Sequence, residues 1–279
     1  PLRRSQVGAQ GWHVLDGDLP LPLAVVRQRA VQHNLGWMQR FANDRQIDMA
    51  PHGKTTLSPQ LFRQQLDAGA WGLTFANVTQ VRAGVAAGAR RCLIANQVFA
   101  PQDLAGIQAL RRDHAGLRVL FLVDSLAQLD AIEAWFGAQA SVPQAFEVLL
   151  EIGVVGGRTG CRQRDQALAL AQRLHASTAC RLVGIECYEG LGASGESTAD
   201  QAYADALMYN VLAVAQACDQ ERWFDGDEVL LSAGGSAIFD LVVQSLRASL
   251  SKPVRGLLRS GCYVTHDHGF YKRMVSVLN

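Results

Sequence analysis

The 279-residue sequence lacks the features of several protein classes. It contains no stretch of eighteen or more apolar residues, so we expect no membrane-spanning helix and no membrane partner. The formal net charge is only +1, which argues against nucleic acid as a partner, because binding to a phosphate backbone requires a basic face. The N-terminal residues contain no apolar run of the kind found in signal peptides.

Cysteine and lysine are both few. The six cysteines are scattered without a CxxC pair, which is typical of reduced thiols in a cytoplasmic protein rather than of a disulfide framework or a zinc site. Only three of the 26 basic residues are lysines, namely Lys54, Lys252 and Lys272. A lysine within an apolar stretch of this sequence is therefore easy to single out.

Hydrophobic residues are abundant, at 49% of the chain, which is enough for a packed core and argues against disorder. Short apolar runs recur, and each is followed by a segment long enough for a helix. The runs cover residues 23–26, 47–50, 73–76, 92–95, 118–123, 146–154, 182–188, 229–233 and 255–260. Amphipathic segments between them cover residues 30–42, 58–69, 125–136 and 165–176.

This alternation predicts parallel strands that are buried on both faces by helices. Two folds fit it, an open doubly wound sheet and a closed (β/α)8 TIM barrel. From residues 47–50 onward there are eight strand candidates, with room for a helix in every gap, and this count favours the barrel. We therefore expect an N-terminal segment at 1–26, a barrel at 27–265 and the incomplete start of a further domain at 266–279.

The chemistry of such a barrel is expected at the C-terminal ends of its strands. Lys54 follows the first predicted strand, where partial desolvation would make its amine nucleophilic and able to form an imine. The glycine-containing turns 232–236 and 260–263 follow strands seven and eight, where such barrels often bind phosphate. Lys54 could instead be a surface lysine and each turn an ordinary tight connection. Together, they suit a phosphorylated aldehyde cofactor.

Other polar residues follow the remaining strands. Arg158 lies among glycines after strand five, where its guanidinium could reach a cofactor ring nitrogen or remain solvated. Tyr188, after strand six, could flank the ring or belong to the core. His52 could position a carboxylate or phosphate, or fill the barrel mouth. His266 and His268 supply only two candidate metal ligands, so we assign no metal site to this sequence.

The segments PHGKTT, GGRTG, CYEG, SAGGS and RSGCYVTHD, in this order over about residues 23–268, resemble the fold-type III pyridoxal phosphate enzymes. The sequence is most similar to the group of D-serine dehydratase, D-threonine aldolase and D-threo-3-hydroxyaspartate dehydratase, whose barrel is of the alanine racemase N-terminal type. The resemblance implies that Lys54 forms the imine and that Arg158 contacts the pyridine nitrogen. It places Tyr188 beside the cofactor ring and assigns the phosphate-binding turns to Gly234, Gly235, Ser236, Gly261 and Cys262. We also expect His52 and Tyr263 to contact the cofactor.

The resemblance also implies features outside the barrel. Members of the group carry a C-terminal β-domain that binds a divalent metal such as zinc or manganese, and this chain is expected to stop before it. The run 23–26 would form a strand of that domain, and the protein would be a homodimer. CYEG departs from the usual sequence of the aldolases at this position, which argues against an aldolase.

These observations predict a pyridoxal phosphate lyase that acts on a D-β-hydroxy amino acid, such as D-serine or D-threonine. Lys54 would remove the Cα proton, and β-elimination would give a keto acid and ammonia. The alternatives are a D-threonine aldolase, an amino-acid racemase with a second base, and a non-catalytic carrier of pyridoxal phosphate on the same barrel.

Overall fold

The protein is described by a computed structural model that covers residues 2–190, 192–267 and 269. Within these residues, eight parallel strands form one sheet in the order β1-β8-β7-β6-β5-β4-β3-β2. The strands are β1 (Asp48–Met49), β2 (Leu73–Phe75), β3 (Arg91–Gln97), β4 (Arg118–Val123), β5 (Phe146–Ile152), β6 (Cys180–Cys187), β7 (Val229–Ala233) and β8 (Val254–Leu258). All eight strands expected from residue 47 onward are confirmed.

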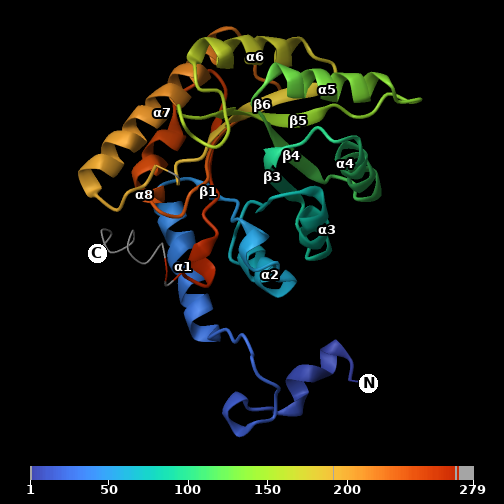
Figure 1. Cartoon of the computed structure of the whole chain (residues 1–279), viewed down its shortest axis with the longest axis vertical. Coiled ribbons are helices and arrows are strands. Elements are labelled where there is room, and N and C mark those ends of the chain that lie inside the picture. Colours follow the sequence, from blue (N-terminus) through green and yellow to red (C-terminus); the bar gives the residue numbers. More distant parts are fainter. Residues whose placement is uncertain (1, 191, 268, 270–279) are drawn as a thin grey trace.

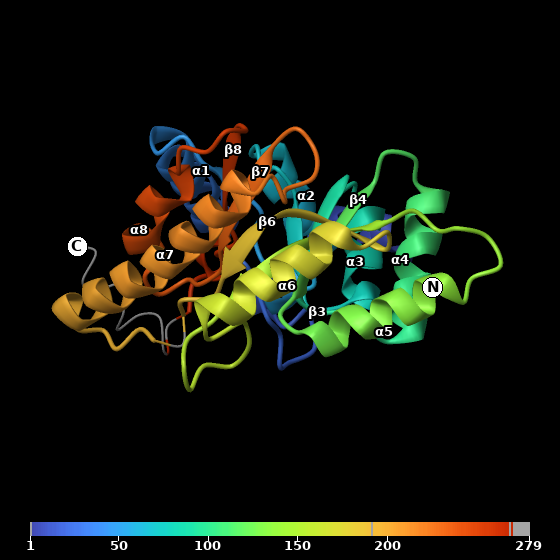
Figure 2. The same ribbon diagram turned by 90° about the horizontal axis from the view of Figure 1, so that it is seen from above.

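Helices lie around the outside of these strands (Figures 1 and 2). They are α1 (Gln28–Asp44), α2 (Pro59–Asp67), α3 (Val78–Ala86), α4 (Pro101–Asp113), α5 (Leu126–Gly137), α6 (Arg164–Ala176), α7 (Ser197–Gln220) and α8 (Phe239–Val242). The four amphipathic segments expected to be helical correspond to α1, α2, α5 and α6. No helix within the described ranges combines the length and hydropathy needed to cross a bilayer.

The sheet closes on itself between β1 and β2. The Trp71 N–H donates to the Met49 carbonyl at 2.8 Å, and the Thr74 N–H donates to the Pro51 carbonyl at 2.9 Å. An isolated parallel bridge between His52 and Thr74 continues this pairing. The fold is therefore the (β/α)8 barrel, and the open-sheet alternative is excluded.

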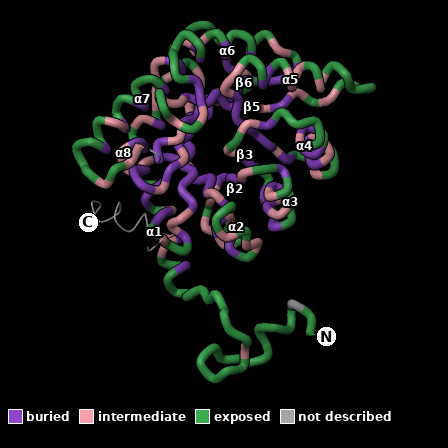
Figure 3. The backbone as a smooth tube through the Cα atoms, in the orientation of Figure 1, coloured by how far each residue is buried: buried purple, intermediate pink, exposed green. Residues whose placement is uncertain are grey.

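Strand β4 shows why the strands read as continuous apolar runs. Leu120 and Leu122 belong to a cluster inside the barrel, whereas Val119, Phe121 and Val123 belong to the layer between strands and helices. Both faces of β4 are thus covered by apolar groups, and Figure 3 shows buried residues along the strands of the barrel. Side-chain caps begin several helices; at the start of α5, Ser125 Oγ accepts a hydrogen bond from the Gln128 N–H at 3.3 Å.

The N-terminal segment lies apart from the barrel (Figures 1 and 3). Residues 23–26 form no strand here, and Leu23, Val25 and Val26 are exposed. Their β-branched side chains favour an extended conformation, but a strand also needs a partner along its edge. The strand expected at 23–26 is therefore not formed in this structure, and its place in a β-domain stays a prediction, as does most of 266–279, which lies outside the described residues.

Gly184 allows β6 and β7 to approach each other closely. It pairs with Leu230, and a Cβ atom at Gly184 would lie 2.0 Å from the Leu230 carbonyl oxygen. We predict that Gly184→Ala lowers the free energy of unfolding by about 1–3 kcal/mol, because the two strands must separate. Gly137→Ala is the control, since a Cβ there meets nothing within 4 Å. Urea unfolding followed by circular dichroism measures both, and equal stability of the two variants would contradict the prediction.

Candidate active site

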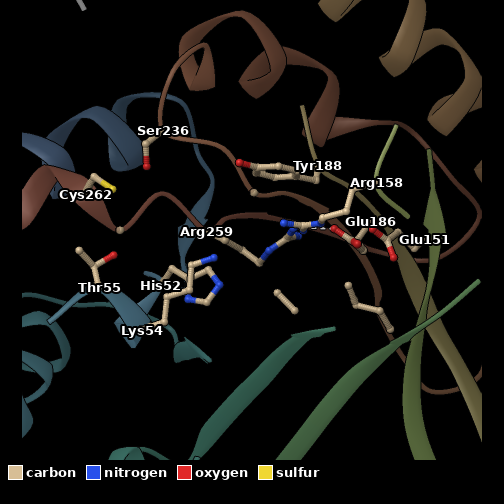
Figure 4. Close-up of a pocket in the computed structure, with 14 residues that line it drawn as sticks. His52, Lys54, Thr55, Glu151, Arg158, Glu186, Tyr188, Ser236, Arg259 and Cys262 are labelled. Carbon is tan, nitrogen blue, oxygen red and sulfur yellow. Dashed lines mark ion pairs between the residues drawn. The ribbon is translucent and has the colours of Figure 1, made fainter. Parts of the chain in front are cut away.

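A pocket at the C-terminal ends of the strands brings together most of the residues singled out in the sequence (Figure 4). Eight of the ten predicted cofactor-binding residues line it, while Gly235 and Tyr263 do not. The lining comprises His52, Lys54, Thr55, Ala95, Leu122, Glu151, Arg158, Glu186, Tyr188, Gly234, Ser236, Arg259, Gly261 and Cys262.

Lys54 lies in a short 3-10 turn, Gly53–Thr55, directly after β1. The turn packs tightly, because a Cβ at Gly53 would lie 2.7 Å from the Phe62 ring and 2.8 Å from the Phe75 ring. The Lys54 side chain reaches the pocket, where partial desolvation lowers the pKa of its ammonium and the positive charge of Arg158 lowers it further. A lowered pKa makes a neutral, nucleophilic amine more accessible near neutral pH.

His52 borders Lys54 and packs against the turn after β8. A Cβ at Gly261 would lie 2.3 Å from the His52 carbonyl oxygen, so only glycine allows this approach. Burial lowers the pKa of His52 to about 3, and the charges of Lys54, Arg259 and Arg158 contribute. The imidazole is therefore neutral at physiological pH. Its buried Nδ1 has no hydrogen-bond partner among the described residues.

The turn after β7 is held by a buried carboxylate. The Gly234 N–H donates to Glu189 Oε2 at 3.0 Å, and the Gly235 N–H donates to Oε1 at 2.6 Å. The Ser260 hydroxyl donates to the Gly235 carbonyl and ties this turn to the one after β8. Two adjacent N–H groups that converge on one anion match the kind of turn expected from the sequence. Here, however, these two donors already bind Glu189.

Arg259 is a buried cation that the sequence reasoning did not single out. It follows β8, and its side chain is 2% exposed. Its Nη1 donates to Ser232 Oγ at 2.6 Å, and its Nη2 lies 2.5 Å from Glu186 Oε2. Its buried Nε has no hydrogen-bond partner in the described part of the chain. The sequence does contain a signal for this residue, because Arg259 is a charged residue within the apolar run 255–260. The run was interpreted only as a strand.

Arg158 lies on the glycine-rich loop after β5. Its Cζ atom is 4.7 Å from the centre of the Tyr188 ring, which is the distance of a cation–π contact. Figure 4 shows the two side chains next to each other at the edge of the pocket. The structure therefore brings Arg158 and Tyr188 together, although they come from different strands.

Two glutamates, Glu151 of β5 and Glu186 of β6, form the acidic side of the pocket and were also missed by sequence reasoning. Glu151 accepts a hydrogen bond from Thr159 Oγ1 at 2.5 Å and one from Gln97 Nε2. Burial, together with the nearby charge of Glu186, raises the pKa of Glu151 to about 8. Burial also raises the pKa of Glu186, and the Arg259 charge opposes this.

The remaining candidates lie elsewhere. The Tyr263 hydroxyl accepts a hydrogen bond from Gln65 Nε2 at 3.4 Å, and burial raises the pKa of Tyr263 to about 12. His266 follows the 3-10 turn at Cys262–Val264, whereas His268 lies outside the described residues. Within the described ranges, no three His, Cys, Asp or Glu side chains come together as a metal-binding group.

Two characterised proteins have sequences similar to this chain. D-threo-3-hydroxyaspartate dehydratase of Delftia sp. (strain HT23) is 34% identical over 174 residues, which cover 62% of this chain and 44% of the dehydratase. D-threonine aldolase of Arthrobacter sp. is 28% identical over 169 residues, which cover 61% of this chain and 43% of the aldolase. The chain thus spans less than half the length of these two relatives in the matched regions.

Solved structures share the fold. The crystal structure of D-threonine aldolase from Filomicrobium marinum superposes with a TM-score of 0.75 at 24% identity, over 92% of this chain and 65% of the aldolase. The Delftia sp. HT23 dehydratase superposes with a TM-score of 0.69 at 28% identity, over 88% of this chain and 61% of the dehydratase. The model of the alanine racemase N-terminal domain matches residues 26–269, which is most of the chain. The chain therefore belongs to the family of the alanine racemase N-terminal domain, the barrel of the fold-type III pyridoxal phosphate enzymes.

Proposed function

We propose that this chain is the cofactor-binding barrel of a pyridoxal phosphate lyase that acts on a D-β-hydroxy amino acid. The observation that carries the proposal is the position of Lys54 in one pocket with the turns after β7 and β8. The dehydratase and aldolase relatives, both named for D-configured hydroxy amino acids, support the substrate class.

The residues of the pocket fit pyridoxal phosphate. Lys54 would bind its aldehyde carbon, and Ser236, Gly261 and Cys262 would hold its phosphate. Gly234 and Gly235, which the sequence also assigned to the phosphate, would act through the turn that they form with Glu189. The fit rests on a lysine with a lowered pKa, a glycine-lined approach and a buried donor without a partner among the described residues, all in one pocket.

That unpaired donor is the Nε–H of Arg259. A pyridine nitrogen is an acceptor without a proton of its own, and a buried donor without a partner is costly. We therefore infer that Arg259 contacts the ring nitrogen, a role that the sequence assigned to Arg158. Arg158, at the pocket edge above Tyr188, is instead suited to a substrate carboxylate, which a guanidinium binds through two parallel hydrogen bonds.

Pyridoxal phosphate, when bound, withdraws electrons from the substrate Cα. Lys54 Nζ then serves as the base that takes the Cα proton, and its lowered pKa suits this task. The guanidinium of Arg259 does not give up its proton to the ring nitrogen, because its own pKa is far too high. Arg259 would therefore leave the ring nitrogen unprotonated, which would weaken electron withdrawal and favour loss of the β-hydroxyl group.

Three other functions use the same barrel. A D-threonine aldolase would split the Cα–Cβ bond, and a racemase would need a second base opposite Lys54. A non-catalytic carrier would bind the cofactor without turnover. We favour elimination because the dehydratase relative has a higher sequence identity to this chain than the aldolase relative. In addition, the residue that contacts the pyridine nitrogen is an arginine, whether it is Arg158 or Arg259.

We also propose that the whole protein is a cytoplasmic homodimer that binds a divalent metal through a domain outside the described residues. The free cysteines, of which five are buried, support a reducing compartment. Exposed apolar side chains between residues 2 and 26 support an intersubunit or interdomain contact. A solved variant of the Delftia dehydratase is described as metal-free, which supports a metal in that protein.

The two arginines can be separated by matched variants of the whole protein. We predict that Arg259→Gln weakens pyridoxal phosphate binding about 10- to 100-fold, as expected for loss of a hydrogen bond from a charged group. Arg158→Gln should mainly raise the substrate KM. Cofactor titration by visible absorbance and steady-state kinetics measure the two effects. If Arg158→Gln loses the cofactor while Arg259→Gln retains it, the ring nitrogen belongs to Arg158.

The reaction type is tested with D- and L-serine, threonine and 3-hydroxyaspartate. The whole protein with pyridoxal phosphate should release a keto acid and ammonia from at least one D-substrate, with glycine plus aldehyde at most a side product. Glycine and aldehyde as main products would support the aldolase, and interconversion of enantiomers the racemase. Absence of all turnover would support the carrier. Chelation should lower turnover but leave the cofactor absorbance intact, if a metal acts as proposed.

A further inference from the structure

Three buried glutamates lie close to one buried arginine behind the pocket. Glu151, Glu186 and Glu189 are each 2% exposed or less, and Arg259 is 2% exposed. Ionised carboxylates removed from water require compensating charges or hydrogen bonds. One guanidinium can neutralise the charge of only one carboxylate. The three carboxyl groups must therefore differ in what stabilises them in the ionised or the protonated form.

Two of the glutamates have partners that stabilise the ionised form. Glu186 forms the ion pair with Arg259, whose Nη2 lies 2.5 Å from Glu186 Oε2. Glu189 accepts two backbone N–H groups, from Gly234 and Gly235. Burial raises the pKa of both carboxyl groups, and the Arg259 charge at Glu186 and the two backbone N–H groups at Glu189 oppose that shift.

Glu151 differs from both. Its hydrogen-bond donors, Thr159 and Gln97, are uncharged, and no salt bridge to it is present among the described residues. Figure 4 shows its carboxyl group beside that of Glu186. The charged or titratable groups around it are Glu186 and Cys187 from β6, Asp124 after β4, Cys161 after β5, and Arg158, Tyr188 and Tyr203, which line cavities together with Glu151. Glu186 is the strongest of its acidic neighbours.

We propose that Glu151 and Glu186 hold one proton between them, and that this carboxyl pair positions Arg259 and sets the net charge behind its Nε–H. Glu186 holds Nη2 of the guanidinium by the ion pair, which leaves Nε without a partner among the described residues. The proton on Glu151 prevents a second carboxylate from competing for the same cation. This role deepens the proposed function and rests on it, since it concerns the arginine assigned to the cofactor nitrogen.

The pair makes the electrostatics of the pocket depend on pH. With one proton retained, Arg259, Glu186 and Glu151 together carry no net charge. Loss of that proton leaves one net negative charge, which changes the electrostatic field at a nearby ring nitrogen. The transition is expected at about pH 8, because burial and the Glu186 charge raise the pKa of Glu151 to that value. A purely structural hydrogen bond would produce no such transition.

The same proton affects stability with a defined sign. Glu151 titrates at its ordinary pKa when the chain is unfolded and at about 8 when it is folded. Between these two values the folded state binds more protons, so the free energy of unfolding falls as pH rises through this window. Below the unfolded pKa the contribution is fully present, and above the folded pKa it is lost.

The experiment compares the wild type with Glu151→Gln and Glu147→Gln, in the whole protein. Glu147 is the matched control, because it lies on the same strand but pairs with Arg118 away from the pocket. With ¹⁵N-labelled pyridoxal phosphate bound, the ring-nitrogen chemical shift of the wild type and Glu147→Gln should change at about pH 8. Glu151→Gln should lack this change.

A second readout works with or without cofactor. The infrared spectrum of the wild type at pH 7 should contain the carbonyl band of a buried protonated carboxyl group. The spectrum of Glu147→Gln should contain the same band, and that of Glu151→Gln should lack it. A wild-type spectrum without this band would overturn the proposal, even if Glu151→Gln failed to fold. The band without any binding of pyridoxal phosphate would refute the proposed function while leaving the shared proton in place. A nitrogen shift that still changes in Glu151→Gln would overturn the link to Arg259.

Discussion

Backbone pairing of the β1 segment with the β8 segment on one side and the β2 segment on the other determines where the pocket lies. On one side, the Ala50 N–H donates to the Leu258 carbonyl at 2.9 Å and the His52 N–H donates to the Arg259 carbonyl at 3.0 Å. On the other side, the bridge from His52 to Thr74 closes the barrel. The chain that leaves β1 is therefore fixed beside the end of β8, and Lys54 enters the pocket opposite Gly261. A shift of this pairing by one residue would turn the Lys54 side chain away.

Arg259 joins three strands at the same end of the barrel. It follows β8, and it binds Ser232 of β7 and both Glu186 and the Cys187 carbonyl of β6. A buried ion pair of this kind adds little net stability, because both charges lose their hydration. The pair instead fixes the orientation of the guanidinium, which is held at several points while its Nε–H has no hydrogen-bond partner among the described residues. The proposed chemistry requires this kind of fixed, water-excluded donor.

The barrel and its lysine were predictable because their signals are local. Apolar runs separated by helix-length segments gave the strand count, and Lys54 was the one lysine directly after a predicted strand. The glycine turns at 234–235 and 261 were identified for the same reason. By contrast, Glu151, Glu186 and Arg259 lie within or next to apolar runs, where they look like ordinary strand residues. Their roles depend on side chains that are far away in the sequence.

The backbone donors of the turn after β7 also have a partner that is distant in the sequence and could not be predicted from a local pattern. Gly234 and Gly235 were recognised as anion-binding, yet their N–H groups bind Glu189, which lies 45 and 46 residues earlier. The apolar run at 23–26 was interpreted as a strand from its composition, but it forms no strand in this structure. The local sequence pattern predicted which residues lie at the C-terminal ends of the strands. It did not predict which side chains they bind there.

The attachment of pyridoxal phosphate to Lys54 is the central claim, and reduction with borohydride tests it most directly. The whole protein, loaded with cofactor, is reduced and digested, and the modified peptide is sequenced by mass spectrometry. One label is expected, on Lys54, because the Lys252 ammonium already donates to the Phe224 and Gly226 carbonyls at 2.7 and 2.8 Å. Label on Lys252 or Lys272, with Lys54 unmodified, would contradict the account.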